Sequence, residues 1–186
     1  MAKKPRKDDS GDTAGENKAA TDQPASPTAG PARPPVGMAI TINAQYTKDM
    51  SFEVPGAPGI YTAMQGTQPE ITVNINVTAN PLKDKTFEVV LEIRADCKVK
   101  SQTAFILELQ YAGVFTLNIP DEHVQAILLI ECPRLLFPFA RNILADVSRD
   151  GGFPPLLLGI VDFASMYQAK LQELQKSAAG GGSATV

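Results

Sequence analysis

Apolar and polar side chains alternate along four segments between residues 39 and 117. The cleanest case is residues 71–79, where Ile71, Val73 and Ile75 are separated by Thr and Asn side chains. A period of two residues is typical of an antiparallel sheet with one face covered and the other in water. The predicted strands are residues 39–54, 71–79, 86–100 and 103–117. One face of the first strand is expected to carry Ile40, Ile42, Ala44 and Tyr46.

The connections between these strands differ in kind. Residues 80–85, NPLKDK, contain turn-forming residues and fit a hairpin between the second and third strands. Residues 55–69, PGAPGIYTAMQGTQP, form a segment that is too long for a hairpin. We therefore expect this second connection to cross over the sheet.

Beyond residue 120 the apolar period lengthens to that of a helix, first over residues 121–150. Pro133 and Pro138 each lack a backbone donor, so this long helix is expected to be kinked or split near them. A second helix is predicted over residues 161–174, capped by Asp162. Strands followed by helices predict an α+β fold, a four-stranded antiparallel sheet with the long kinked helix and the C-terminal helix on one face.

The ends of the chain differ in composition from its centre. Residues 1–37 contain six of the 15 prolines and no aromatic residue. Such a segment buries too little apolar area to offset its ordering entropy, and we expect it to be disordered. The predicted domain covers residues 38–175, and residues 176–186 are expected to form a flexible tail.

Charge and hydropathy exclude several partners. Residues 1–37 carry a net charge of +1, and the remaining residues carry −4. A mildly acidic body argues against nucleic acid or an anionic membrane surface as the main partner. None of the uncharged runs reaches the length of about 20 residues that crosses a bilayer, so direct membrane insertion is not expected.

The reactive side chains are few. Cys97 and Cys132 are the only cysteines and His123 is the only histidine, which argues against a structural zinc site. Two unpaired thiols favour a reducing, cytoplasmic location. A serine or cysteine nucleophile would need His123 as its base, but this residue lies near the predicted start of a helix beside two acidic residues. We therefore expect no enzyme activity, no metal and no cofactor.

The predicted core is thin for about 140 ordered residues, yet the strands carry extra apolar groups. Val90, Ile106 and Val114 fall on the nominally solvated side of the sheet. Surplus apolar surface of this kind indicates a partner subunit or a ligand groove. Scattered exposed aliphatic side chains are the alternative at this point.

Four stretches of the sequence form a distinctive set of motifs: YTKDMSFEVPGAP (46–58), FEVVLEI (87–93), CPRLLFPFARNILADVSRDGGFPPLLL (132–158) and VDFASMYQ (161–168). Together they resemble the SecB family of bacterial protein-export chaperones. The similarity runs from Ile40 to Leu174. It implies a homotetramer, a dimer of dimers, in which a second subunit supplies the missing cover. The positions that match the family's oligomer interface are Leu107, Leu109 and Tyr111; packing within one chain is the alternative for each.

The resemblance also implies a function, which is to hold unfolded precursor proteins for export without ATP. The client-binding groove would be formed by helix, sheet and crossover connection. Its candidate residues are Ile71, Val73, Ile75, Phe137, Phe139, Ile143 and Phe153. We hypothesise that Pro138 bends the helix so that neighbouring aromatic rings line a cleft. For each single residue, core packing remains equally open. The chain contains no tryptophan, which leaves the contribution of the crossover connection to client binding open.

A second site implied by the resemblance is acidic and binds the zinc-containing carboxyl terminus of the SecA motor ATPase. The matching residues are Asp49, Glu53, Ile106 and Glu108. Asp49 and Glu53 lie four residues apart on one predicted strand, so they share a face at a spacing of about 13 Å. A solvated face with ordinary charges is the alternative. An oligomeric adaptor that binds no unfolded chain is the alternative for the whole protein.

Overall fold

The computed structural model describes residues 39–180, with side chains as far as residue 176. The predicted N-terminal tail, residues 1–37, lies outside the described residues, as do residues 181–186. The described elements follow one another in the order β1, α1, β2, β3, β4, α2, η1, α3 and α4.

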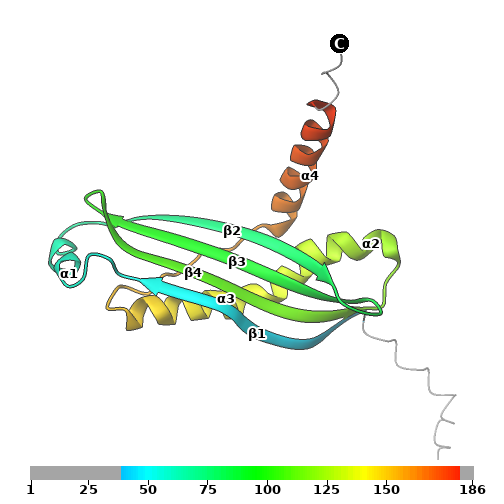
Figure 1. Ribbon diagram of the computed structural model, residues 1–186, viewed down its shortest axis with the longest axis horizontal. Helices are drawn as coiled ribbons and strands as arrows, with labels where there is room; N and C mark the ends of the chain where they lie inside the picture. The colour runs from blue at the N-terminus through cyan, green and yellow to red at the C-terminus, as the bar shows by residue number, and fades with distance from the viewer. Residues whose placement is uncertain (1–38, 181–186) are drawn as a thin grey trace, which may run out of the picture. The chain divides into compact units, whose positions relative to one another are not determined.

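All four predicted strands are present and form one antiparallel sheet in the order β1-β4-β3-β2 (Figure 1). They are β1 (Ile40–Glu53), β2 (Glu70–Pro81), β3 (Thr86–Val99) and β4 (Gln102–Leu117). β1 and β2 lie at opposite edges, so residues 54–69 cross from one edge to the other, as predicted. The short helix α1 (Gly59–Ala63) lies within this crossover connection.

The two hairpins close with tight turns. Leu82 donates its amide to the carbonyl of Thr86 at 2.9 Å, which confirms the hairpin predicted between β2 and β3. Between β3 and β4, Lys100 and Ser101 both adopt positive φ angles, 50° and 66°. Two successive left-handed residues match the right-handed twist of the flanking strands in a short hairpin.

The prediction that Ile40, Ile42, Ala44 and Tyr46 share one face of β1 is wrong. The pairing of β1 with β4 shifts between Ile42 and Ala44, and again between Thr47 and Asp49. Each extra residue turns the following side chains to the other side of the sheet. Ile42 therefore lies on the same face as its partner Phe115, whereas Tyr46 lies on the opposite face, where its hydroxyl reaches Glu88.

The long predicted helix is present but contains a π-helical segment. α2 (Asp121–Ala126) continues through η1 (Ile127–Glu131) into α3 (Cys132–Asp150). The widened turn ends two residues before Pro133, which has no amide to donate to the preceding turn. α3 then passes through Pro138 without interruption. The irregularity expected near the two prolines is thus located at the first of them.

The predicted C-terminal helix is present as α4 (Phe163–Gly180), which begins two residues after the start of the predicted range, directly after the predicted cap. Asp162 caps it, since its Oδ1 accepts the Ser165 amide at 3.0 Å. Phe163 is buried, and α4 then leads away from the sheet (Figure 1). Residues 176–180, which we expected in a flexible tail, are helical.

The core lies between α3 and one face of the sheet, which we call the helix face; we call the other the open face. Leu136, Ala140 and Leu144 of α3 are fully buried against side chains of β3 and β4. Gly113 of β4 lets α3 come close, because a Cβ there would lie 2.8 Å from Leu136. The fold is thus two layers, as predicted, although α4 leads away from the sheet after the buried Phe163 and only its beginning packs beside α3 (Figure 1).

Candidate functional site

An apolar groove follows the edge strand β2 on the helix face. Ile71, Val73 and Ile75 form one wall and the extended residues 156–161 form the other, around a hollow of about 400 Å³. Leu157 and Ile160 of the second wall are 67% and 99% exposed. Large exposed apolar side chains beside an open hollow indicate a surface that another chain covers.

The groove continues at Ile71 into a second hollow of about 250 Å³ with aromatic walls. Phe153 lines it, with its ring centroid 4.9 Å from that of Phe105 and 5.3 Å from that of Tyr61. Tyr61 and Met64 come from the crossover connection, and Met64 lines the hollow directly. The crossover connection therefore contributes to the groove wall although it contains no tryptophan. We use "apolar groove" for both hollows together.

Two side-chain hydrogen bonds fasten the walls of the groove to the end of α3, beside the backbone bond from the Phe153 amide to the Ser148 carbonyl at 3.1 Å. The Ser148 side chain is fully buried, and its Oγ accepts the Leu156 amide at 2.8 Å while donating to the Leu144 carbonyl at 2.9 Å. On the other side, the Tyr61 hydroxyl donates to the Gly151 carbonyl at 3.0 Å. Ser148 thus positions the segment after α3, and Tyr61 positions the crossover connection.

The structure brings together only part of the predicted client-binding set. Ile71, Val73, Ile75 and Phe153 line the apolar groove. The other three predicted residues, Phe137, Phe139 and Ile143, do not line it.

Those three residues lie on α3. Phe137 is buried and its ring lies edge-on to Phe163 of α4, with centroids 5.9 Å apart. Phe139 is 52% exposed and stacks on Tyr111 of β4. Ile143, one helical turn after Phe139, is half-buried. The two rings beside Pro138 therefore contact different elements and share no cleft; their client-binding role stays a prediction.

The predicted oligomer-interface residues lie under α3. Leu107 and Leu109 are fully buried within the single chain, and Tyr111 is nearly so. Their direct environment is thus the intrachain core. An effect on assembly would act through this packing, and it stays a prediction.

The four residues of the predicted acidic site lie side by side on the open face. Glu53 on β1 pairs with Ile106 on β4, Ser51 pairs with Glu108, and Asp49 pairs with Gln110. Cross-strand partners share a face of the sheet. We call Asp49, Glu53, Ile106 and Glu108 the acidic site.

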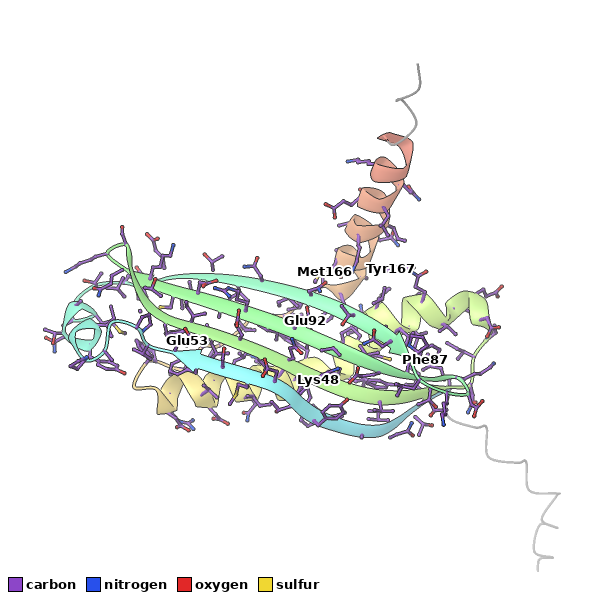
Figure 2. All side chains as sticks on the ribbon, viewed as in Figure 1. Lys48, Glu53, Phe87, Glu92, Met166 and Tyr167 are labelled. Carbon is purple, nitrogen blue, oxygen red and sulfur yellow. The ribbon has the colours of Figure 1, made fainter. Side chains whose placement is uncertain are left out.

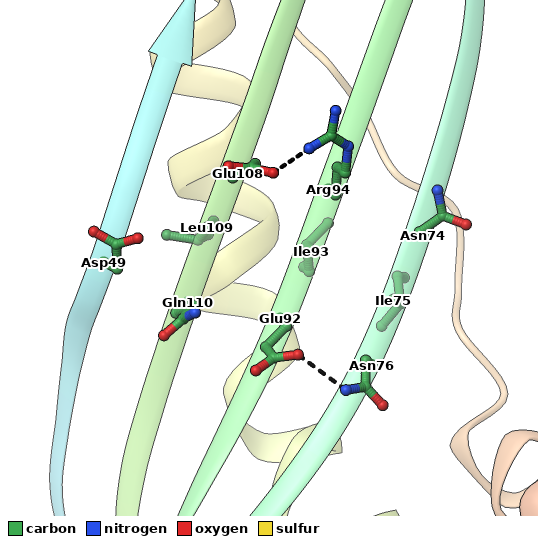
Figure 3. A pocket seen from close by; sticks show the side chains of 10 residues that line it. All are labelled: Asp49, Asn74, Ile75, Asn76, Glu92, Ile93, Arg94, Glu108, Leu109 and Gln110. Atoms are coloured by element: carbon green, nitrogen blue, oxygen red, sulfur yellow. Dashed lines mark hydrogen bonds and ion pairs between the residues drawn. The ribbon is translucent and has the colours of Figure 1, made fainter.

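The open face also contains residues that the resemblance did not assign. A shallow hollow of about 360 Å³ extends from the acidic site across β3 to β2 (Figure 3). Arg94 binds Glu108 there, and Glu92 accepts a hydrogen bond from the Asn76 amide at 2.9 Å. The alternation along the second and third strands could have identified these residues, because it places every second side chain on the solvated face.

A second cluster of charged and polar side chains on the open face links the bulged strand β1 to β3. Lys48 contacts Glu88 at 2.8 Å, and the Tyr46 hydroxyl donates to the same carboxylate at 2.5 Å. These two hydrogen bonds, that from Lys48 foremost, hold the pKa of Glu88 below its ordinary value, while the bond to Glu88 raises the pKa of Tyr46. Figure 2 shows Lys48 and Glu53 on β1 and Glu92 on β3.

Other chemistry is sparse in the described part of the chain. Burial, together with nearby Glu131, raises the pKa of the Cys132 thiol to about 12, and burial also raises that of Cys97. Both thiols are therefore protonated and poorly nucleophilic at neutral pH. Among residues 39–180, no three His, Cys, Asp or Glu side chains gather as metal ligands. No helix of this part is long and apolar enough to cross a membrane.

These features define a class of protein, an α+β binding protein with an open apolar groove beside one edge strand and an acidic site on the opposite face. Its groove is extended and lined by aliphatic and aromatic side chains, which suits a chain segment more than a small molecule.

Comparisons with known proteins agree with this class. Residues 34–174 match the family model described as preprotein translocase subunit SecB. Protein-export protein SecB of Rhodospirillum rubrum is 54% identical over 140 residues, which cover 75% of this chain and 87% of that protein. The same protein of Paramagnetospirillum magneticum is 52% identical over 135 residues, covering 73% and 87%. That of Granulibacter bethesdensis is 49% identical over 156 residues, covering 79% and 91%.

A solved structure gives the same fold at lower sequence identity. It is a Mycobacterium tuberculosis SecB-like chaperone in complex with a peptide from an antitoxin, with a TM-score of 0.52 and 19% identity over 67% of this chain and 91% of that chain. The chain belongs to the SecB family of protein-export chaperones, as the sequence resemblance predicted.

Proposed function

We propose that this protein acts in the cytosol as a homotetramer that holds unfolded precursor proteins without ATP and passes them to SecA. The observation that carries the proposal is the apolar groove, with Leu157 and Ile160 largely exposed along its rim. An unfolded precursor exposes apolar side chains that its native state hides. Fully burying one Leu or Ile side chain contributes about 1.5–3 kcal/mol, so a few such contacts hold an extended segment.

The groove's preference for unfolded precursors explains how the protein keeps them from folding. A protein that binds the unfolded chain and not the native one draws the equilibrium away from folding by mass action. Slowly folding precursors remain available for capture longest. No nucleotide is needed, because the client's own folding rate decides whether it is captured.

The acidic site supports docking of SecA. Asp49 and Glu53 are exposed on β1, with Glu108 beside them on β4. A basic segment of SecA, here its zinc-containing carboxyl terminus, would be attracted to this face. Such complementarity raises the association rate and sets orientation more than it raises affinity. The zinc belongs to SecA in this proposal.

Exposed apolar side chains away from the groove support assembly into a dimer of dimers. Ile42 and Met50 of β1 lie on the helix face with Leu135 and Phe139 of α3, and all four are between 40% and 52% exposed. Identical chains that bury the same patch on each other form closed, symmetric oligomers. We therefore propose that sister subunits cover these side chains.

Refolding of a slowly folding precursor in the presence of the protein tests the proposal. An equimolar amount of tetramer should slow refolding and leave the precursor bound. An unchanged rate would contradict client holding and leave an oligomeric adaptor as the function. The Glu108→Lys variant should still slow refolding but bind SecA more weakly, so the two activities are tested separately.

A further inference from the structure

Arg94 of β3 is held between two carboxylates on the open face, and only one of them belongs to the acidic site. Its Nε donates to Asp96 Oδ2 and its Nη2 to Asp96 Oδ1, each at 2.9 Å. Its Nη1 donates to Glu108 Oε1 on the neighbouring strand β4 (Figure 3). Glu108 is therefore already paired with a cation of its own chain.

The two contacts of Arg94 are unequal. With Asp96 the guanidinium forms a two-pronged pair that uses parallel N–H groups, the strongest geometry for this ion pair. With Glu108 it shares a single N–H. Arg94 can thus leave Glu108 and remain paired with Asp96, so releasing Glu108 exposes no unpaired charge.

The surroundings allow an incoming side chain to reach Glu108. Its side chain is 48% exposed, and it lines the hollow of about 360 Å³ with Asp49, Glu92 and Gln110. A lysine or arginine of a bound segment that enters this hollow meets carboxylates from three strands. Arg94 is the cation with which it competes for Glu108.

We propose that Arg94 is a resident counter-ion that a basic side chain of SecA displaces from Glu108, so that Arg94 lowers the affinity of the acidic site for SecA. The inference rests on the proposed SecA docking and adds a residue that tunes it. Weak, reversible docking suits a chaperone that delivers its client and then leaves.

The expected effect is modest because the ion pair is solvent-exposed. Exposed pairs of this kind are weak, so removing the competitor should raise SecA affinity by about 1.4- to fivefold. The gain should diminish as salt rises, since the freed carboxylate attracts the partner through a screened interaction.

The test measures SecA binding by isothermal titration calorimetry with the full-length chain, at low and high salt. Arg94→Ala and Arg94→Gln should both bind SecA more tightly than the natural chain. Lys98→Ala is the matched control, because it removes one exposed positive charge from the same strand without freeing Glu108. Adding Glu108→Gln to Arg94→Ala should abolish the gain.

The outcomes separate the inference from the function on which it rests. Equal or weaker SecA binding by both Arg94 variants, with a loss in Glu108→Gln alone, would overturn the role of Arg94 and keep the docking site. An equal gain in Lys98→Ala would also overturn it, since net charge would then explain the effect. Unchanged SecA binding in the single variant Glu108→Gln would contradict the docking of SecA at the acidic site.

Discussion

Replacing Ser148 by alanine should loosen the apolar groove without touching any residue that lines it. Ser148 is fully buried, and its hydroxyl is the acceptor for the Leu156 amide at 2.8 Å. Alanine leaves this nearly buried amide without a partner. An unsatisfied buried donor costs about 1–3 kcal/mol, so the free energy of unfolding should fall by that amount.

The loosening of the groove segment matters more for function than the fall in the free energy of unfolding. Phe153, Leu156 and Leu157 follow α3 in the segment that Ser148 fastens, and all three line the groove. If the segment detaches so that the Leu156 amide binds water, Ser148→Ala should weaken the binding of an unfolded precursor as well as lower the free energy of unfolding. Leu156 should then show faster amide hydrogen exchange than in the natural chain.

Three measurements at one fixed protein concentration check this prediction: urea unfolding, amide exchange and precursor affinity. Ser51→Ala is the control, because it removes a hydroxyl from the open face whose contact with Glu108 is long, at 3.5 Å. It should change stability by less than about 0.5 kcal/mol. Unchanged amide exchange at Leu156 in Ser148→Ala, together with an unchanged free energy of unfolding, would refute the role of Ser148 in holding the segment after α3.

Three further predictions follow from the structure. Gly151→Ala should lower stability by about 1–3 kcal/mol, because its Cβ would lie 2.2 Å from the Phe52 ring; urea unfolding measures this. Leu157→Ser should leave stability within about 0.5 kcal/mol, since Leu157 is 67% exposed, yet weaken precursor binding severalfold in a titration. The hydrogen bond from Lys48 holds the pKa of Glu88 below its ordinary value, so the ion pair stabilises the fold at pH values above that ordinary pKa, and this stabilisation is lost as pH falls through the lowered pKa. Lys48→Met should therefore flatten the acid limb of a stability-against-pH curve.

Each of these has a contrary result. A Gly151→Ala variant as stable as the natural chain would mean that Phe52 moves away without cost. Full precursor affinity in Leu157→Ser would remove this rim residue from the groove's binding surface. An acid limb of Lys48→Met that matches the natural chain would show that the Tyr46 hydrogen bond to Glu88 is enough.

The sheet and its connections were predictable because alternation reports burial directly. Ile71, Val73 and Ile75 lie on the predicted face, and the long Pro- and Gly-rich connection crosses the sheet. The facing of the β1 side chains was not predicted correctly, because a bulge adds one residue without changing the apolar character of the strand. Nothing in the sequence alone distinguishes Ile42 from Tyr46 in facing direction.

The family resemblance, and not the alternation, selected the site residues. Their facing was predictable where the alternation of one strand decided it, and not where two elements had to meet. Parity placed Glu108 and Asp49 outward, and pairing of β1 with β4 brings them together. Phe137 and Phe139 were assigned to one cleft, but neighbouring residues on a helix point about 100° apart, and residues 137 and 139 about 200° apart. The link between Ser148 and Leu156 joins two segments whose approach depends on the tertiary fold.

The most direct test of the central claim is to map where an unfolded precursor touches the protein, by methyl NMR of the full-length chain. Binding should perturb the methyl groups of Ile71, Ile75 and Ile160, which line the groove. It should leave Val90 and Ile106 of the open face unchanged. Perturbation confined to the open face, or none at saturating precursor, would contradict the claim that the apolar groove holds unfolded chains.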